Sequence, residues 1–307
     1  MAAKLIFGCG YLGHRVARRW LAEGHTVYAV TRHVDRAAAW RGEGLHAIVA
    51  DVTRPATLVD LPAVDSLLFA VGHEGERGRG PTNDHVAGLA NVLEAISPAV
   101  RRLIYISSTG VYGDCQGEWI DEETACEPQR PSGRACLTAE QMLVEHAYSA
   151  RTVILRLAGI YGPGRIPRKD VLLAGEPIDA PQHGYLNLIH VDDAVRAVLA
   201  ADRVSAELPR RYLISDGSPV VRGEYYAELA RLLGAPPPRF RPPDIETPAH
   251  ARAAADKRVC NARMAAELKV ALRFIDYRAG LRAIVGGTET PYRSSDSSGP
   301  GSSAEPR

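Results

Sequence analysis

The sequence predicts an α/β protein, a doubly wound parallel sheet followed by a smaller C-terminal lobe. Short apolar runs alternate with amphipathic segments through the N-terminal half, and this alternation favours a parallel sheet with helices on both faces. A glycine-rich turn joins the first apolar run to the first amphipathic segment. Beyond residue 163 the composition shifts toward proline, glycine and charge, which indicates the start of the second lobe.

The composition is that of a globular protein with a small-molecule partner. Of the 307 residues, 46% are hydrophobic and 24% are charged, which is enough to form a sizeable core. The net charge of +1 provides no overall attraction to nucleic acid or to a membrane surface. We therefore expect a small-molecule substrate, no nucleic-acid or membrane partner, and a monomer or homodimer.

The cysteines and the hydropathy pattern predict a cytoplasmic location. The five cysteines have neither C-x-x-C spacing nor the density of a disulfide scaffold, which indicates reduced thiols. No apolar run approaches the roughly 18 residues of a membrane span. The N-terminus is expected to begin a strand instead of a signal peptide.

The first predicted element is a strand that ends in a glycine-rich turn. Residues 5–7 are apolar and are followed by Gly8, Gly10 and Gly13 in the spacing G-x-G-x-x-G. Gly8 suits the tight turn, Gly10 leaves room for a pyrophosphate beside the backbone, and Gly13 lets the next helix pack closely on the strand. This arrangement predicts a dinucleotide-binding domain of the Rossmann type.

The helix after this turn would place its N-terminus at the cofactor phosphates. Unpaired N–H groups at Tyr11, Leu12 and Gly13 combine with the helix dipole to favour an anion there. The alternative is a tight strand-to-helix turn that binds nothing. The strand before the turn, the helix after it and the second strand that follows favour dinucleotide binding.

The second predicted strand, residues 25–30, ends where such domains contact the cofactor's ribose. An acidic residue there would select NAD, but the chain has Thr31 and Arg32, with Arg36 one turn further on. A guanidinium group suits the 2′-phosphate of NADP because it forms charge-assisted hydrogen bonds. The sequence therefore predicts NADP, with NAD less favoured. The alternative is that Arg32 is only a solvated surface charge.

Two further strands are expected to end at the same edge of the sheet. The third precedes Asp51 and Val52, and the fourth precedes Val71 and Gly72, so we assign these four residues to the cofactor site. The next segment, residues 73–82, is rich in glycine and charge. It is either a flap near the cofactor or a flexible connection, and the sequence favours neither.

Seven stretches carry a family resemblance over residues 3–285, in the order GCGYLG, ADVT, HVAGLANVLEA, YISSTGVYGD, LRLAGIYGPG, NLIHVDDAV and KRVCNARMAAEL. With these stretches the chain resembles the extended short-chain dehydrogenase/reductase superfamily, and within it the NAD-dependent epimerase/dehydratase group. The resemblance implies a Rossmann-type sheet that binds a nicotinamide cofactor. It also implies an oxidoreductase or epimerase-like reaction on a polar, sugar-like or nucleotide-linked substrate.

The resemblance further indicates a catalytic position at the end of the fifth strand. Ser108 matches the Ser or Thr that holds the substrate's reacting oxygen in the family, and Tyr112 follows in a Val-Tyr-Gly triplet. We take both as candidate catalytic residues. The alternative for Ser107 and Ser108 is a polar strand end whose hydroxyls cap the next turn.

The family's catalytic pair is absent. The usual pattern Y-G-x-S-K-L-x-A-E aligns without gaps on SGRACLTAE, so that Ser132 stands for the tyrosine and Cys136 for the lysine. A serine hydroxyl does not ionise near neutrality, and a neutral thiol cannot replace an ammonium group. In a helix predicted over residues 84–96, His85 also stands where the family usually has Asn.

Other acid/base candidates remain, and so does a non-catalytic alternative. Tyr112, Tyr161, Tyr185 and His190 can carry a proton, but spacing does not single out any of them. The alternative is a catalytically degenerate NADP(H)-binding sensor or scaffold. We expect no metal, because the two aspartates after His190 are typical of a helix N-terminus and no second cluster has ligand spacing.

The domain boundaries follow from composition and pattern. Residues 1–163 are expected to form mainly the dinucleotide-binding domain, and residues 164–287 mainly the substrate lobe, with strand and helix segments that return to the first domain. Within the lobe, residues 185–190 predict a strand, and residues 257–272 resemble the family's C-terminal helix. Residues 288–307 are rich in Ser, Gly and Pro and predict a disordered tail.

Two cations stand at the start of that C-terminal stretch. Lys257 and Arg258 are adjacent and precede its first apolar residue. Either they reach an anionic group in the cleft or they are solvated charges, which is the commoner outcome. The sequence leaves both interpretations open.

Overall fold

The computed structural model describes residues 1–72, 83–241 and 255–287, so the expected loop over 73–82 and the expected tail over 288–307 lie outside the described residues. At its centre is a seven-stranded sheet in the order β12-β7-β5-β4-β1-β2-β3, and every neighbouring pair is parallel. The predicted doubly wound fold is confirmed. The seven strands are β1 (Ala3–Phe7), β2 (Thr26–Thr31), β3 (His46–Val49), β4 (Ser66–Phe69), β5 (Arg102–Ser108), β7 (Thr152–Leu157) and β12 (Arg210–Ile214).

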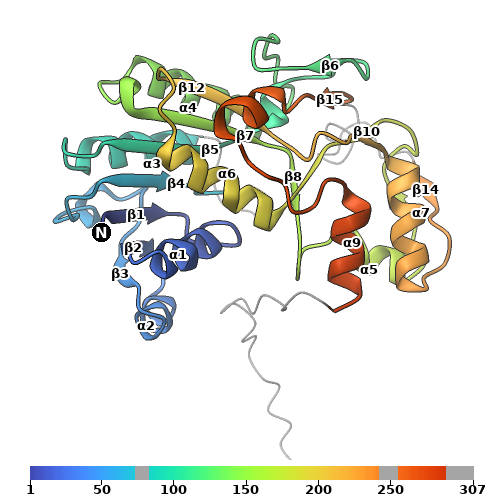
Figure 1. Cartoon of the computed structure of the whole chain (residues 1–307), viewed down its shortest axis with the longest axis horizontal. Helices are drawn as coiled ribbons and strands as arrows, with labels where there is room; N and C mark the ends of the chain where they lie inside the picture. The colour runs from blue at the N-terminus through green and yellow to red at the C-terminus, as the bar shows by residue number, and fades with distance from the viewer. Residues whose placement is uncertain (73–82, 242–254, 288–307) are drawn as a thin grey trace, which may run out of the picture.

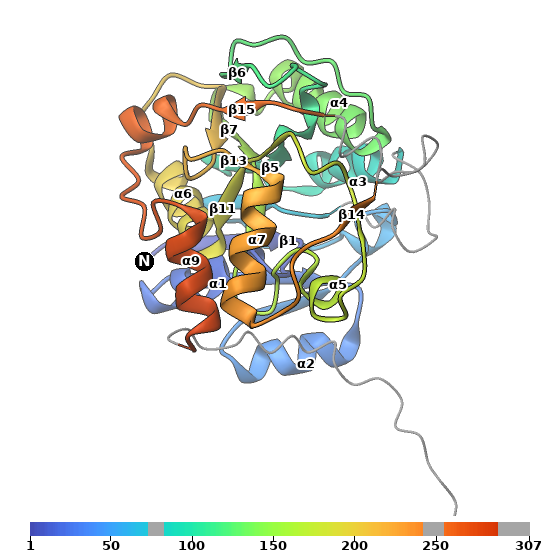
Figure 2. The same ribbon diagram turned by 90° about the vertical axis from the view of Figure 1, so that its right-hand side faces the viewer.

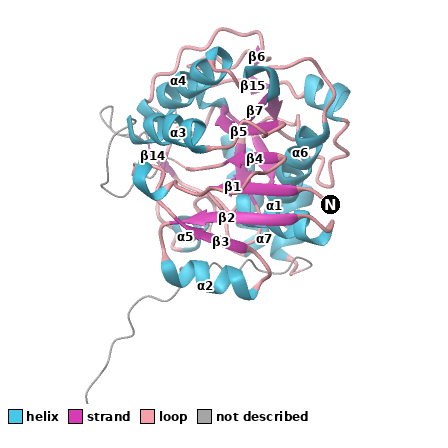
Figure 3. Cartoon of the chain, turned by 90° about the vertical axis from the view of Figure 1, so that its left-hand side faces the viewer, coloured by secondary structure: helices cyan, strands magenta, loops and turns pink. Residues whose placement is uncertain are grey.

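Helices cover both faces of this sheet, as Figures 1 and 3 show. Alternate side chains of a strand point to opposite faces, so Leu5 and Phe7 of β1 pack on the α3 and α4 side while Ile6 packs on the α1 and α6 side. A strand that is buried on both faces has consecutive apolar residues, so the sequence pattern predicts β1 and β4. The helices around the sheet are α1 (Gly13–Ala22), α2 (Val34–Gly42), α3 (Asn83–Ala95), α4 (Pro131–Glu145) and α6 (Val191–Arg203).

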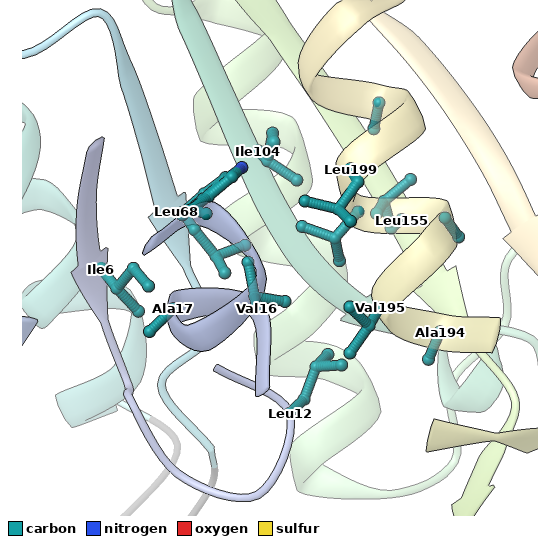
Figure 4. Packing of buried hydrophobic residues seen from close by; sticks show 14 of the residues in the cluster. Ile6, Leu12, Val16, Ala17, Leu68, Ile104, Leu155, Ala194, Val195 and Leu199 are labelled. Carbon is teal, nitrogen blue, oxygen red and sulfur yellow. The ribbon is translucent and has the colours of Figure 1, made fainter. Parts of the chain in front are cut away.

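The core between α1 and α6 joins the two halves of the chain. In Figure 4, Ala17 of α1 lies beside Ile6 of β1, and Val16 lies on the side of Val195 of α6, all within one apolar cluster. Val16 and Ala17 are fully buried. Burial of a side chain of the size of valine or leucine stabilises the fold by about 1.5 to 3 kcal/mol. Residues about 180 positions apart in the sequence therefore share one core.

The sheet has a topological switch point between β1 and β4. From β1 the chain proceeds to β2 and β3 on one side, and from β4 to β5, β7 and β12 on the other. In open α/β sheets, ligands bind in the crevice that forms at such a switch point, beside the carboxyl ends of the strands. The β1–α1 turn opens at this point.

A smaller group of elements lies beyond the edge at which β1 and β4 end, as Figures 1 and 2 show. It contains the helices α5 (Lys169–Leu173), α7 (Arg222–Leu233) and α9 (Tyr277–Val285). Tyr161, Tyr225 and Tyr277 are buried in its apolar core. In contrast, β12 and α6 from the same half of the chain join the main sheet. The exact boundary at residue 163 stays a prediction.

Short strand pairs and single turns complete the structure. The strand pairs are β6 (Trp119–Ile120) with β15 (Arg258–Val259), β8 (Gly159–Tyr161) with β11 (Leu188–His190), β9 (Ile178–Asp179) with β14 (Phe240–Arg241), and β10 (Tyr185–Leu186) with β13 (Val220–Val221). The single turns are η1 (Pro55–Thr57), η2 (Thr109–Val111), η3 (Ser149–Arg151) and η4 (Met264–Leu268).

Two element predictions were wrong in detail. Residues 185–190 form two strands, β10 and β11, because the chain breaks at Asn187. The Asn187 amide donates to the Lys257 carbonyl at 2.9 Å and accepts from the Val259 N–H at 2.7 Å. Residues 257–272 contain the strand β15 and then a short helical stretch over residues 262–268, which is α-helical at first and π-helical in η4. In the described ranges no helix is long and apolar enough to cross a bilayer.

Candidate cofactor and substrate site

The β1–α1 turn leaves no space for side chains at its first and last glycines. Gly8 has φ +83°, and a Cβ there would lie 2.3 Å from the carbonyl group of Ala70 and 2.4 Å from the N–H nitrogen of Val71. A Cβ on Gly13 would lie 2.4 Å from the Gly8 carbonyl oxygen. Both glycines are therefore needed because backbone approaches backbone, as the sequence predicted.

The middle glycine of the turn faces open space. A Cβ on Gly10 would meet nothing within 4 Å, which leaves the room that a pyrophosphate needs beside the backbone. Helix α1 begins at Gly13, has no acidic residue in its first turn, and its N-cap residue Leu12 makes no side-chain capping bond. These N–H groups and the helix dipole suit an anion. The residues therefore fit a dinucleotide cofactor.

Tyr11 connects the β1–α1 turn to residues 163–165 in the second half of the chain. Its hydroxyl donates to the Pro163 carbonyl at 3.2 Å, and the Arg15 guanidinium lies 4.1 Å from the ring centroid. Arg165 contacts the same ring from the other segment, at 5.3 Å. The tyrosine therefore positions the 162–165 turn beside the cofactor site, a contact that the glycine pattern did not reveal.

The predicted ribose-side residues come together at the ends of β2 and β3. Arg32 is exposed there, whereas Thr31 is buried and its hydroxyl accepts from the His33 N–H at 3.2 Å. Asp51 accepts two hydrogen bonds from Thr53, at 2.9 and 2.8 Å. Burial opposes ionisation of Asp51, but these bonds and the charge of Arg32 lower its pKa. Arg32 and Asp51 are therefore near neighbours.

The other predicted cofactor residues line the same edge. The Val52 carbonyl accepts from the Asn91 amide at 2.8 Å, so α3 fixes the chain after β3. Val71 and Gly72 follow β4, and a Cβ on Gly72 would meet nothing within 4 Å. The structure thus brings Val71 next to the β1–α1 turn and leaves space beside Gly72.

Ser108 ends β5 and caps the turn η2. Its hydroxyl oxygen accepts from the Gly110 N–H at 3.0 Å. The capping interpretation is therefore confirmed for Ser108, while its hydroxyl proton remains available to a ligand. Ser107 behaves differently because its hydroxyl donates to Glu140 at 2.5 Å.

Tyr112 is buried, and its hydroxyl has two partners within the protein. It is 1% exposed, its hydroxyl donates to the Asp121 carbonyl at 2.8 Å, and it accepts from Arg156 at 2.6 Å. Burial raises the pKa of the Tyr112 phenol far above its ordinary value. These contacts give Tyr112 a structural role, and its catalytic role stays a prediction.

A buried ion pair lies behind Tyr112, between β7 and α4. Arg156 donates to both carboxylate oxygens of Glu140, at 2.6 to 3.2 Å, and both side chains are buried. The hydrogen bonds and charge of Glu140 outweigh burial and raise the pKa of Arg156. The glutamate of the SGRACLTAE stretch therefore anchors α4 to the sheet.

The positions of the missing catalytic pair lie on the first turns of α4. Ser132 is half-buried, and Cys136 is buried. Burial raises the pKa of the Cys136 thiol to about 11, and hydrogen bonds with Tyr105 and Ser107 only partly oppose this. The thiol is therefore neutral at physiological pH. His85, the other departure from the family pattern, lies 2.8 Å from the Tyr105 hydroxyl through Nε2.

Two of the remaining acid/base candidates are structural. Tyr161 is fully buried, and burial raises its pKa. His190 is fully buried too, caps α6 by accepting from the Asp192 N–H at 3.2 Å, and has its pKa lowered to about 4 by burial. Tyr185 is only partly buried, on β10. Within the described ranges there is no group of three or more His, Cys, Asp or Glu residues that could hold a metal ion.

Two basic residues contact the segment that follows β5. Arg130 was not identified from the sequence. A Cβ added to Gly110 would lie 2.9 Å from the Arg130 Nη2 and 3.2 Å from the Ser108 hydroxyl oxygen, so both side chains reach the same side of Gly110. Lys257 is buried, and its amine donates to the Gly113 carbonyl at 3.2 Å. Both cations therefore border the 108–113 segment at the end of β5.

Comparisons with known proteins agree with this geometry. The model of the NAD dependent epimerase/dehydratase family matches residues 5–215. The chain is 32% identical to Protein YeeZ of Escherichia coli (strain K12) over 245 residues, 77% of this chain and 85% of YeeZ. It is 28% identical over 254 residues to the 3-diazoavenalumate denitrifying reductase of a Streptomyces species, covering 76% of this chain and 82% of that one.

A solved structure is similar over almost the whole length. The putative NAD-dependent epimerase/dehydratase from Methylobacillus flagellatus has a TM-score of 0.75 and 30% sequence identity to this chain. The match covers 94% of this chain and 98% of that one. The similarity therefore includes the C-terminal elements as well as the sheet.

Proposed function

Because the chain belongs to the NAD-dependent epimerase/dehydratase family, we propose that it is an NADP(H)-using oxidoreductase or epimerase-like enzyme. Its substrate would be a polar, sugar-like or nucleotide-linked small molecule. The family depends on a nicotinamide cofactor, which supplies or accepts a hydride when bound. The observation that carries the proposal is the β1–α1 turn, where Gly8 and Gly13 are closed by backbone and Gly10 faces open space.

The preference for NADP rests on Arg32. An exposed guanidinium stands at the end of β2, where an acidic residue would contact the ribose hydroxyls of NAD. Asp51 at the end of β3 has a lowered pKa, so it is ionised and can attract the same guanidinium. A 2′-phosphate would compete for Arg32 as a second anionic partner.

Among the chain's own residues, Ser108 is the candidate for holding the substrate's reacting oxygen. Its hydroxyl accepts from Gly110, which fixes the oxygen and leaves the proton free to be donated outward. The relative named as a reductase supports a redox reaction on this fold. Neither Tyr112 nor Tyr161 has the access that a proton donor needs.

A second candidate function is a sensor or scaffold that binds NADP(H) and performs little chemistry. It is favoured by Ser132 and Cys136, which supply neither the phenol nor the ammonium of the family's catalytic pair. The buried, neutral thiol of Cys136 adds to this argument.

Turnover separates the two candidates. Purified full-length protein would be titrated with NADPH and NADH by calorimetry, and then assayed for cofactor oxidation or substrate conversion on a panel of carbonyl compounds and sugar nucleotides. Cofactor binding with turnover supports the enzyme. Binding without turnover on any member of the panel supports the sensor, and absence of binding by either dinucleotide rejects both.

A further inference from the structure

Two lysines of this chain are equally buried but differently partnered. Lys4 and Lys257 are each 5% exposed. The Lys4 amine lies 2.5 Å from an Asp202 carboxylate oxygen and donates to the Ser66 hydroxyl at 3.0 Å. The Lys257 amine donates only to the Gly113 carbonyl, and among the described residues no carboxylate lies within 4.0 Å of it. A buried charge is normally paired with an opposite charge, and of these two lysines Lys257 departs from that rule.

The two aspartates whose charges act on Lys257, Asp114 and Asp256, accept hydrogen bonds from other groups. Asp114 accepts from the Asp256 N–H at 3.0 Å and from the Gln116 N–H at 3.0 Å. Asp256 accepts from the Tyr185 N–H at 2.7 Å. Their hydrogen bonds go to backbone, so they shape the loop around Lys257 without pairing its charge.

A second cation lies on the same segment. Arg130 precedes α4 and reaches the Gly110 turn beside the Ser108 hydroxyl. Burial lowers the pKa of the Lys257 amine and the positive charge of Arg130 lowers it further, whereas the negative charges of Asp114 and Asp256 oppose this shift. Lys257 and Arg130 therefore border the same 108–113 segment at the end of β5, which begins with the residue assigned to the reacting oxygen.

We propose that Lys257 and Arg130 form a subsite that binds an anionic oxygen group of the substrate, a carboxylate or a phosphate. The inference rests on the proposed function, because it takes Ser108 as the neighbouring substrate contact. An anion between the two cations supplies the missing partner of Lys257 and cancels the repulsion from Arg130. Charge-assisted bonds of this kind orient a ligand as well as hold it.

The test is a calorimetric titration of the full-length protein with inorganic phosphate and, separately, with malonate, at constant ionic strength. We expect saturable binding of at least one anion by the wild type, and a loss of at least tenfold in affinity in both Lys257→Met and Arg130→Gln. The anion that binds more tightly identifies the subsite as one for phosphate or for carboxylate. Absence of saturable binding of either anion overturns the proposal.

Matched variants separate this subsite from general charge effects. Lys269→Met removes an exposed lysine, and Arg134→Gln removes an exposed arginine one turn further along α4. Both should bind the anion as the wild type does. An equal loss in these variants overturns the proposal, because it would show that overall charge and not position sets the affinity.

Two outcomes distinguish the subsite from the cofactor site. Phosphate binding that survives Lys257→Met and is blocked by NADPH would place the phosphate at the N-terminus of α1 and would overturn the subsite. Failure of NADPH to bind the wild type would reject the proposed function while the anion titrations still decide the subsite. Should Lys257→Met fail to fold, Arg130→Gln carries the test, because Arg130 is only half-buried.

Discussion

The β1–α1 turn and the β5–α4 junction lie on the same edge of one sheet, but they keep the family pattern to different degrees. At the first, Gly8, Gly10 and Gly13 are all present, and each has the surroundings that its role requires. At the second, the strand, turn and helix are intact, yet Ser132 and Cys136 stand where the family resemblance predicts a tyrosine and a lysine. The local fold is intact in both regions. Neither of the two α4 positions, however, carries the residue type that the family resemblance predicts for catalysis.

The difference follows from what each region depends on. At Gly8 and Gly13 an added Cβ would lie only 2.3 to 2.4 Å from backbone atoms, so a side chain at either position disturbs the fold itself. The junction is held from behind by the Glu140–Arg156 pair, which does not involve residues 132 and 136. Catalytic positions can therefore change without loss of the scaffold. The predictions below test this contrast.

The largest effect is expected at Gly8. In Gly8→Ala the new Cβ would meet the Ala70 carbonyl at 2.3 Å, and alanine would have to adopt φ +83°. We expect a loss in the free energy of unfolding on the order of 4 to 6 kcal/mol, from strain and overpacking together. Urea denaturation measures it.

Gly10→Ala is the matched control in the same turn. Nothing lies within 4 Å of the added methyl group, so the unfolding free energy should stay within about 1 kcal/mol of the wild type. NADPH affinity should fall, because the methyl group occupies the space assigned to the pyrophosphate. A Gly8→Ala protein as stable as Gly10→Ala would contradict the backbone argument.

The second effect is expected at the pair that anchors the junction. Glu140→Gln keeps the shape of the side chain but leaves the Arg156 guanidinium buried without its counter-charge. The free energy of unfolding should fall by about 3 to 5 kcal/mol. Glu145→Gln, at the exposed end of the same helix, should change it by no more than about 0.5 kcal/mol. Equal stabilities in the two variants would show that the pair does not anchor α4.

A smaller effect, on binding alone, is expected at Arg32. Arg32→Asp should weaken NADPH by on the order of 1.5 to 3 kcal/mol, the usual value for a hydrogen bond to a charged group, and should invert the preference toward NADH. Arg18→Asp makes the same charge change at an exposed position of α1 and should leave the preference unchanged. Equal NADPH and NADH affinities in the wild type would refute the assignment of Arg32.

The smallest effect is expected at Ser132. With any substrate that gives turnover, Ser132→Ala should lower the rate by less than about tenfold, whereas a catalytic general acid contributes roughly 10² to 10⁴. Thr138→Ala, on the exposed face of α4, provides the control. A loss of a hundredfold or more, with NADPH affinity and stability intact, would mean that Ser132 takes part in the chemistry and that this junction is catalytic after all.

Much of the site could be predicted because its signals are local. The positive φ of Gly8, the apolar runs of β1 and β4 and the cap at Ser108 depend on a residue and its near neighbours. The burial of Tyr112 could not be predicted. Its burial depends on Arg156, 44 residues away, and on how α4 packs against the sheet.

The sequence by itself determined the fold class and the position of the glycine turn, because strand periodicity and glycine spacing are local properties of the chain. The absence of the catalytic pair stays a prediction from the family resemblance. Only the tertiary structure decided the break at Asn187, the burial of Lys257 and the approach of Arg130 to Ser108. Asn187 meets residues 70 and 72 positions away, and Lys257 meets Gly113 across 144 positions. Such contacts depend on how the two halves of the chain pack together, and a linear pattern does not record that packing.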